Sequence, residues 1–440
     1  MPSTVEHNEK SQTAPEAKND APVQNFENPK WLTAELFEKL LKDTVANYKS
    51  IKCFETKPAL APGENYVTII LRVHIDIELV DGTPKSLSYI LKLPQEVEAY
   101  KDMMRKHNIF EIEYRMYHEV VPEFEQLYRQ SGIELNFSAK CYHIEAPSEF
   151  GVILLQDMRP LGYKNANRLE GLDLEHTQAV LERLAQWHAA SAVRVETKGL
   201  YPELFNKGML AAAGGDSFTN FIISIKSHVF ESVKAIEGSE AYIDSVTNTL
   251  DKMVGEILRT EGYDSSEFNV LNHGDCWCNN MMFKYDSEGK LEDALLVDYQ
   301  MINYGSPAKD LHYFLTSSTR YELKVNRFDY FIKFYHDNLY FGGNAVLVKN
   351  LMLLKYPKKP PTLKDMHIAM LKHGLCGFAA AVGAMPAALL ESNSDATIDG
   401  FVGETEAGAR FRNALYTNPS FRKHMEIVVP FMNNRGVFEM

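Results

Sequence analysis

The sequence predicts an α+β protein with two lobes: a small N-terminal lobe with an antiparallel sheet and one helix, and a larger, mainly helical C-terminal lobe. Three observations predict this fold. Residues 66–78 are rich in β-branched residues and alternate towards their end, as strands do, and residues 87–93 follow a turn as the return strand. Beyond Gly162 most apolar residues recur at helical spacing. One hairpin pattern, within residues 271–299, interrupts that helical half.

The composition is that of a globular protein. The chain has 440 residues, 45% hydrophobic and 24% charged, which is enough for a large core and for two or three domains. Lys and Arg number 46 against 59 Asp and Glu, so the net charge is −13, and no segregated basic patch is visible. We therefore expect no nucleic-acid partner, because binding to phosphates requires such a patch.

Cysteine usage and hydropathy predict a cytoplasmic protein without a membrane span. The five cysteines are scattered and odd in number, and the first residues lack an apolar signal region. This pattern is typical of a reducing compartment. Residues 374–390 are uncharged and close to the length needed to span a bilayer. They are mainly Ala and Gly and contain Pro386, which favours a helix packed inside the protein.

The small lobe is expected to begin after a disordered tail, residues 1–24, which is polar and has no apolar periodicity. Asn28 followed by Pro29 predicts a helix start, since Asn favours the cap and Pro the first helical position. The two predicted strands form a hairpin around a turn at residues 81–84.

A helix and another strand complete the small lobe. Four apolar residues at helical spacing predict the helix: Phe110, Tyr114, Tyr117 and Val121. We expect Pro122 to end it. A strand at residues 151–155 leads to a connector at 156–162. The predicted domains are therefore an N-lobe over 25–160 and a C-lobe over 161–440, with a ligand cleft between them.

The C-lobe is expected to open with a helix over residues 177–193. Its predicted buried face consists of five residues: Val180, Leu181, Leu184, Trp187 and His188. The later hairpin has strands at residues 281–285 and 294–298, joined by a turn at 286–289.

Residues 273–280 carry the strongest chemical signal. His273, Asp275 and Asn280 fit H-x-D-x-x-x-x-N, the spacing of the catalytic loop in kinases. Phosphoryl transfer needs a carboxylate that orients the attacking hydroxyl and accepts its proton, and Asp275 is the candidate. It also needs oxygen ligands for Mg²⁺. The candidates are Asn280 and Asp298, the latter at the end of the hairpin.

Two residues of the small lobe are candidates for holding the phosphates of ATP. Lys92 lies in an otherwise apolar strand, where a charge needs a partner. Glu113 lies next to the apolar stripe of the following helix, so we favour it over its neighbour Glu111. A strand lysine paired with a helix glutamate is how kinases hold the α- and β-phosphates.

Together these motifs resemble the ecdysteroid kinase-like family, in the aminoglycoside phosphotransferase and choline kinase branch of the protein-kinase-like fold. The similar segments run over almost the whole chain after the tail: 65–66, 91–92, 110–122, 154–158, 184–191, 273–280, 296–300 and 305–311. The resemblance implies a protein that phosphorylates a hydroxyl of a small molecule with ATP and Mg²⁺. The acceptor would be an ecdysteroid, the named substrate of the family, or a related steroid or foreign compound.

The resemblance also implies roles for single residues. Asp275 would be the catalytic base, and Asn280 and Asp298 the metal ligands. The implied ATP-binding residues are Asn65, Lys92, Glu113, Gln156, Asp157 and Met158, with residues 156–158 forming a hinge that contacts adenine through its backbone. Asp310 would brace the catalytic loop, and His188 would be a buried, hydrogen-bonded histidine.

Other functions compete with an active steroid kinase. A pseudokinase that binds ligands without turnover is disfavoured because the lysine, the base and both metal ligands are present. A metal-dependent hydrolase using His273 and Asp275 leaves Lys92 without a role, and a zinc site at Cys276 and Cys278 lacks further ligands. A choline- or aminoglycoside-like kinase would bind a polar acceptor, whereas the aromatic C-lobe favours an apolar one. We expect a monomer with a small-molecule partner and no membrane partner.

Overall fold

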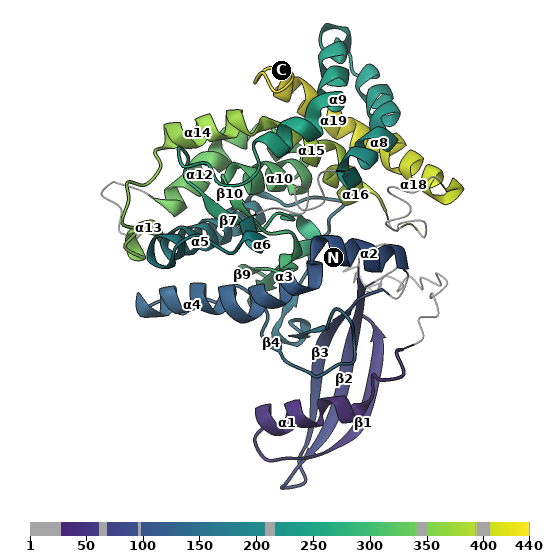
Figure 1. Cartoon of the computed structure of the whole chain (residues 1–440), viewed down its shortest axis with the longest axis vertical. Helices are drawn as coiled ribbons and strands as arrows, with labels where there is room; N and C mark the ends of the chain where they lie inside the picture. The colour runs from purple at the N-terminus through teal and green to yellow at the C-terminus, as the bar shows by residue number, and fades with distance from the viewer. Residues whose placement is uncertain are drawn as a thin grey trace, which may run out of the picture.

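The computed structural model describes residues 28–60, 68–95, 98–206, 216–340, 350–391, 393 and 405–439. It has an antiparallel sheet at one end and a mainly helical body at the other (Figure 1), so the predicted two-lobed α+β fold is confirmed. The expected tail, residues 1–24, lies outside the described residues, and so does Asn65.

The sheet of the small lobe has five antiparallel strands in the order β1-β2-β3-β5-β4. Its strands are β1 (Tyr48–Pro58), β2 (Ile69–Leu79), β3 (Pro84–Leu93), β4 (Cys141–Tyr142) and β5 (Ile153–Gln156). The hairpin of β2 and β3 follows the predicted turn. Alternate residues of β2 are buried from Leu71 to Ile77, and α1 (Glu38–Thr44) packs in the same core. Edge strand β1 was not predicted, because most of its residues are exposed or partly exposed and give no clear apolar pattern.

The first helix begins later than its start signal indicated. A short 3₁₀-helix covers Ala34–Phe37 and runs into α1. The prediction of a helix start at Asn28 is wrong, because the Asn28 amide does not cap a helix. Instead its Nδ2 donates a hydrogen bond to Thr56 Oγ1 of β1 at 2.6 Å. The side chain therefore ties the entering chain to the sheet.

The helical stripe of the small lobe continues through the proline that was expected to end it. Helices α2 (Glu98–His107) and α3 (Ile109–Arg115) lead to a π-helical turn, Met116–Val120, and then to α4 (Val121–Gln130). Pro122 lies in the first turn of α4, where a missing N–H costs no helical hydrogen bond. The wide turn absorbs the irregularity: the Val121 N–H donates to the Met116 carbonyl, five residues back.

The C-lobe is a helical body with two short pieces of sheet. Its main helices are α5 (Leu174–Lys198), α8 (Asp216–Lys234), α9 (Ile243–Arg259), α10 (Ala308–Ser318), α12 (Phe328–Leu339), α14 (Leu363–Lys372), α15 (Gly374–Val382), α16 (Ala384–Leu389), α18 (Glu406–Thr417) and α19 (Pro419–Asn433). Shorter helices are α6 (Glu203–Asn206), α11 (Tyr321–Lys324) and α13 (Asn350–Leu353). The strands are β6 (Tyr163–Lys164), β7 (Val270–Asn272), β8 (Met281–Tyr285), β9 (Leu291–Leu296) and β10 (Asn303–Gly305). The hairpin of β8 and β9 confirms the one predicted.

The central helix α5 carries the predicted buried face, whose five residues are all fully buried. Trp187 stacks on Tyr299 with ring centroids 4.9 Å apart and contacts Phe124 of α4 edge-on at 4.6 Å. Helix α4 therefore packs into the same core as α5, and Figure 1 places it between the sheet and the helical body. We keep residue 160 as the proposed end of the N-lobe in the sequence. The helices α3 and α4, which precede it, nevertheless share a hydrophobic core with the C-lobe.

The small-residue segment 374–390 forms two buried helices, α15 and α16, which meet at Gly383. A Cβ added at Gly377 would lie 2.7 Å from His312 Nδ1 of α10, so the small residue permits close helix packing. This confirms the prediction of a helical segment packed inside the protein. In the part of the chain that the structure describes, no helix is both long and apolar enough to cross a membrane.

Candidate active site

Strand β3 and helix α3 bring Lys92 and Glu113 together, as the sequence predicted. Lys92 Nζ donates to both carboxylate oxygens of Glu113, at 2.7 and 2.8 Å. Both residues are buried, with exposed fractions of 4% and 1%, whereas the Glu111 side chain is mostly exposed. The choice of Glu113 over Glu111 therefore agrees with the observed pairing.

Lys92 also contacts Asp298, at 2.9 Å from Nζ to Oδ1. This second ion pair joins the small lobe to the C-lobe and was not predicted. Burial by itself would lower the pKa of Lys92, but Asp298 and Glu113 outweigh it and the net shift is upward. Burial raises the pKa of Glu113, although Lys92 opposes that shift.

The backbone of Asp298 has an unusual conformation. Its φ of 71° and ψ of 65° lie in the left-handed region, which residues with a Cβ rarely adopt. The residue follows β9 after Val297, whose N–H donates to the Asn280 carbonyl at 3.0 Å. The Tyr117 hydroxyl accepts a hydrogen bond from the Asp298 N–H at 3.4 Å. Such strained residues cluster at functional sites, because only surrounding contacts can hold them in place.

The catalytic-loop candidate Asp275 has a hydrogen-bond donor on each carboxylate oxygen. Asn280 Nδ2 donates to Oδ2 at 2.9 Å, and the Tyr313 hydroxyl donates to Oδ1 at 2.7 Å. Burial and the nearby charge of Asp298 raise the pKa of Asp275, and the bonds from Tyr313 and Asn280 oppose that shift. Asp275 and Asn280 of the loop and Asp298 after β9 therefore lie at one site.

Buried polar residues hold the loop in this conformation. The Asp310 carboxylate accepts hydrogen bonds from the N–H groups of His273 and Gly274, at 2.7 and 2.9 Å, and contacts His188 Nε2 at 3.2 Å. These contacts confirm that Asp310 braces the loop and that His188 is a hydrogen-bonded core histidine. His273 Nδ1 accepts from the Asp275 N–H while Nε2 donates to the Val297 carbonyl, so its ring links the loop to the strand before Asp298.

Gly274→Ala is expected to destabilise this loop strongly. Gly274 has a φ of +79°, and an added Cβ would lie 1.9 Å from the Met301 carbonyl oxygen. We expect a loss of at least about 2 kcal/mol in the free energy of unfolding, measured by urea denaturation. Gly289→Ala is the matched control, because Gly289 has a φ of +80° with nothing within 4 Å of its Cβ position. Equal losses in the two variants would contradict the close approach at Gly274.

The predicted hinge follows β5 and is braced by a side chain. Asp157 Oδ2 accepts hydrogen bonds from Arg72 Nε and Ser88 Oγ, each at 2.7 Å, and the Asp157 N–H donates to the Ser88 carbonyl. Asp157 is therefore committed to contacts within the small lobe. In the described residues the Met158 N–H has no acceptor, whereas the Gln156 N–H donates to the Lys140 carbonyl.

A cavity of about 360 Å³ lies beside Asp275. Both Asp275 and Tyr313 line it, and its walls carry several apolar side chains: Phe218, Phe221, Trp277, Ala380, Ala384 and Ala387. The volume falls in the range of small-molecule sites. A larger cavity, of about 660 Å³, is lined by none of the predicted site residues. The smaller cavity is therefore the one placed to present a ligand to Asp275.

Tyr313 is the site residue that sequence reasoning missed. The aromatic residues of the C-lobe were considered only as a group, as evidence for an apolar acceptor. The position of Tyr313 gave a usable signal, because it lies three residues after Asp310 on α10 and so on the same helix face. A residue one turn from the loop brace was a candidate for the same loop.

The described residues include no cluster of three or more His, Cys, Asp or Glu side chains arranged to bind a metal ion. The metal ligands predicted from the sequence, Asp298 and Asn280, both carry side-chain oxygens. Because Asn280 Nδ2 is committed to Asp275, its Oδ1 is the atom left for an ion. A carboxylate and an amide oxygen fit Mg²⁺, which takes few protein ligands and completes its shell with water and phosphate.

Comparison with known proteins identifies the family. No curated protein matches the chain. The model of the ecdysteroid kinase-like family matches residues 62–341, which include Lys92, Glu113, Asp275, Asn280 and Asp298. The match covers more than half of the chain, and the antiparallel small lobe and helical large lobe agree with a kinase-like fold. The chain belongs to the ecdysteroid kinase-like family, a family of kinase-like small-molecule phosphotransferases.

Proposed function

We propose that the protein is an ATP- and Mg²⁺-dependent kinase that phosphorylates a hydroxyl of an ecdysteroid, a related steroid or an apolar foreign compound. One observation carries the proposal: Lys92 of the small lobe contacts both Glu113 and Asp298, and the charge of Asp298 is near enough to raise the pKa of Asp275. Phosphoryl transfer depends mainly on positioning and on charge stabilisation, and this arrangement supplies both.

Each residue has a distinct task in the proposed reaction. The acceptor oxygen forms a bond to the γ-phosphorus, the bond from that phosphorus to the bridging oxygen breaks, and ADP leaves. Asp275 orients the hydroxyl and takes its proton. Lys92, held by Glu113, contacts the α- and β-phosphates. Bound Mg²⁺, held by Asp298 and Asn280, would neutralise charge on the phosphates.

The apolar cavity beside Asp275 supports the acceptor class. Aromatic and alanine side chains in its walls favour a flat, apolar molecule over an aminoglycoside, which would require many polar contacts. Choline would require an aromatic cage closed around its cation. A transfer assay with a panel of hydroxylated steroids and foreign compounds tests this class, and exclusive activity on choline or an aminoglycoside would contradict it.

Asp298→Ala is expected to remove the effect of Mg²⁺ on ATP binding, because it deletes the one carboxylate proposed for the ion. ATP is titrated with and without Mg²⁺, and the ratio of the two dissociation constants should approach one in the variant. Glu288→Ala, at an exposed position in the turn of the same hairpin, is the control and should keep the wild-type ratio. A full Mg²⁺ effect in Asp298→Ala would contradict the assignment.

Tyr313→Phe is expected to lower kcat about tenfold, since it deletes the hydrogen bond that fixes one oxygen of Asp275. The ring remains in place, so the KM for ATP should stay within about twofold. Steady-state kinetics with varied ATP separate the two parameters. An unchanged kcat would show that the hydroxyl does not position the base.

A further inference from the structure

Besides Asp275 and the loop brace Asp310, the wall of this cavity contains a buried ion pair. Lys309 lies in the first turn of α10, next to the loop brace Asp310, and Glu261 lies two residues beyond α9. Lys309 Nζ and Glu261 Oε2 are 3.1 Å apart, and their side chains are only 9% and 10% exposed. Both residues line the cavity, so the pair forms part of its wall.

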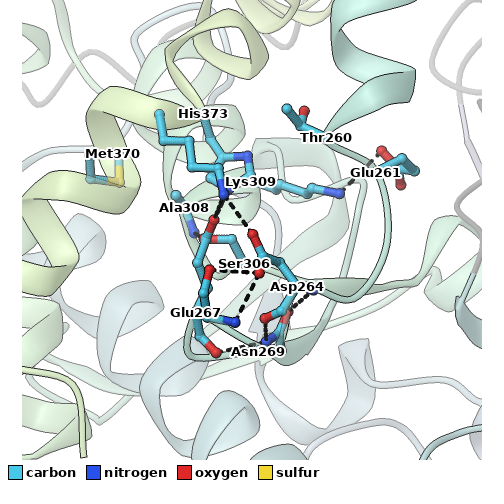
Figure 2. A network of polar contacts seen from close by, with 12 residues as sticks. Thr260, Glu261, Asp264, Glu267, Asn269, Ser306, Ala308, Lys309, Met370 and His373 are labelled. Carbon is cyan, nitrogen blue, oxygen red and sulfur yellow. Dashed lines mark hydrogen bonds and ion pairs between the residues drawn. The ribbon is translucent and has the colours of Figure 1, made fainter.

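The ammonium of Lys309 is poorly satisfied. Within the described residues Glu261 is its sole ion-pair partner, and the contact is too misaligned to count as a hydrogen bond. The nearby carboxylates of Asp264 and Glu267 do not satisfy the Lys309 ammonium. They already form ion pairs with Lys372 and His373. Figure 2 shows Lys309 extending to Glu261, apart from the contacts around Asp264 and Glu267.

An ion pair of this kind in an apolar wall needs an explanation. Removing two charges from water costs more than a misaligned contact returns, so the pair is not retained for stability alone. A buried donor without an acceptor is also unfavourable. The carboxylate oxygens of Glu261 are not among the fully buried unsatisfied atoms, so they remain accessible to a small partner.

We propose that the Lys309–Glu261 pair is a specificity site that binds a second, uncharged hydroxyl of the acceptor. This inference rests on the proposed function and adds to it. A hydroxyl can donate to the accessible carboxylate of Glu261, while Lys309, whose Nζ is fully buried, holds that carboxylate in place. A carboxylate would be repelled by Glu261. The acceptor is therefore an apolar diol, with one hydroxyl at Asp275 and the other at the pair.

The test measures binding in the absence of nucleotide, so that it does not depend on phosphoryl transfer. The probes are an androstane diol with a hydroxyl at each end of the ring system, the corresponding mono-alcohol and the corresponding hydroxy acid. Calorimetric titration of the full chain should give about tenfold or tighter binding of the diol over the mono-alcohol. The hydroxy acid should bind no better than the mono-alcohol.

The double variant Lys309→Met/Glu261→Gln removes both charges and nearly preserves the volume. Its preference for the diol should fall to about one, while its affinity for the mono-alcohol stays within about threefold. Lys372→Met is the matched control: Lys372 belongs to the neighbouring network but does not line the cavity, so the preference should persist. If the double variant melts at a lower temperature than the natural protein, the near-isosteric single variant Glu261→Gln is tested instead. We expect its preference for the diol over the mono-alcohol to be reduced.

Three results would overturn the inference: equal binding of diol and mono-alcohol by the natural protein, an undiminished preference in the variants, or no binding of either alcohol. Failure of the proposed kinase function has a different signature. In that case the diol preference and its loss in the variants would persist, and no phosphate would be transferred from ATP.

Discussion

Asp275→Asn is expected to lower kcat for phosphoryl transfer about a thousandfold, because an amide cannot take the proton of the attacking hydroxyl. The affinity for ATP should change less than about threefold, since the base acts on the acceptor. Single-turnover transfer and ATP titration measure the two quantities separately. Transfer at the natural rate in this variant would remove Asp275 from the reaction.

The same substitution has a structural effect that can be checked independently. Asn280 and Tyr313 each donate to one oxygen of Asp275, and an asparagine offers only one acceptor oxygen to these two donors. We expect a loss of about 1–2 kcal/mol in the free energy of unfolding, measured with urea. A larger loss accompanied by weaker ATP binding would mean that the loop has collapsed and that the kinetic effect is indirect.

Lys92→Met is expected to reduce transfer by about a hundredfold or more, since it removes the charge proposed to hold the phosphates. It should also lower the free energy of unfolding by about 3–5 kcal/mol, because Glu113 and Asp298 lose the cation between them. Kinetics and urea denaturation measure the two effects. An unchanged rate of phosphoryl transfer in this variant would contradict the assignment of Lys92 to the nucleotide site.

Two companion variants separate charge from packing at this position. Lys85 lies at an exposed position of the same strand, β3. Lys85→Met should therefore change neither activity nor stability appreciably. Lys92→Met combined with Glu113→Gln should be less than additive, because both substitutions act on one contact. Additive losses would mean that Glu113 acts independently of Lys92.

The parts of the site that sequence reasoning predicted depend on local signals. The loop from His273 to Asn280 is a contiguous motif, and its place before a hairpin follows from the alternation of residues that form β8 and β9. Lys92 stood out because it is a charged residue in an apolar strand. Glu113 stood out because it borders the apolar stripe of a helix. Such patterns determine burial, and burial determines which charges need partners.

The parts that were missed depend on contacts between distant segments. Lys92 and Asp298 are separated by 206 positions, and no local pattern links them. Asn28 was expected to cap a helix, but its amide donates a hydrogen bond to Thr56 of β1. Strand β1 is an edge strand whose exposed residues gave no apolar pattern. Pro122 was expected to end a helix, but a π-helical turn accommodates it. At Asn28 a tertiary contact overrides the local preference, and at Pro122 the backbone of the preceding turn adjusts to the proline.

The central claim is that the chain transfers phosphate to an alcohol at Asp275, and the most direct measurement is the transfer of labelled γ-phosphate from ATP to the androstane diol. The full chain is assayed with and without Mg²⁺, beside Asp275→Asn. The account predicts a labelled phosphate ester that requires Mg²⁺ and is nearly absent with the variant. Binding of Mg²⁺-ATP and of the diol, with no labelled ester formed from it or from any member of the steroid and foreign-compound panel, would contradict the account and indicate a pseudokinase that binds ligands without turnover.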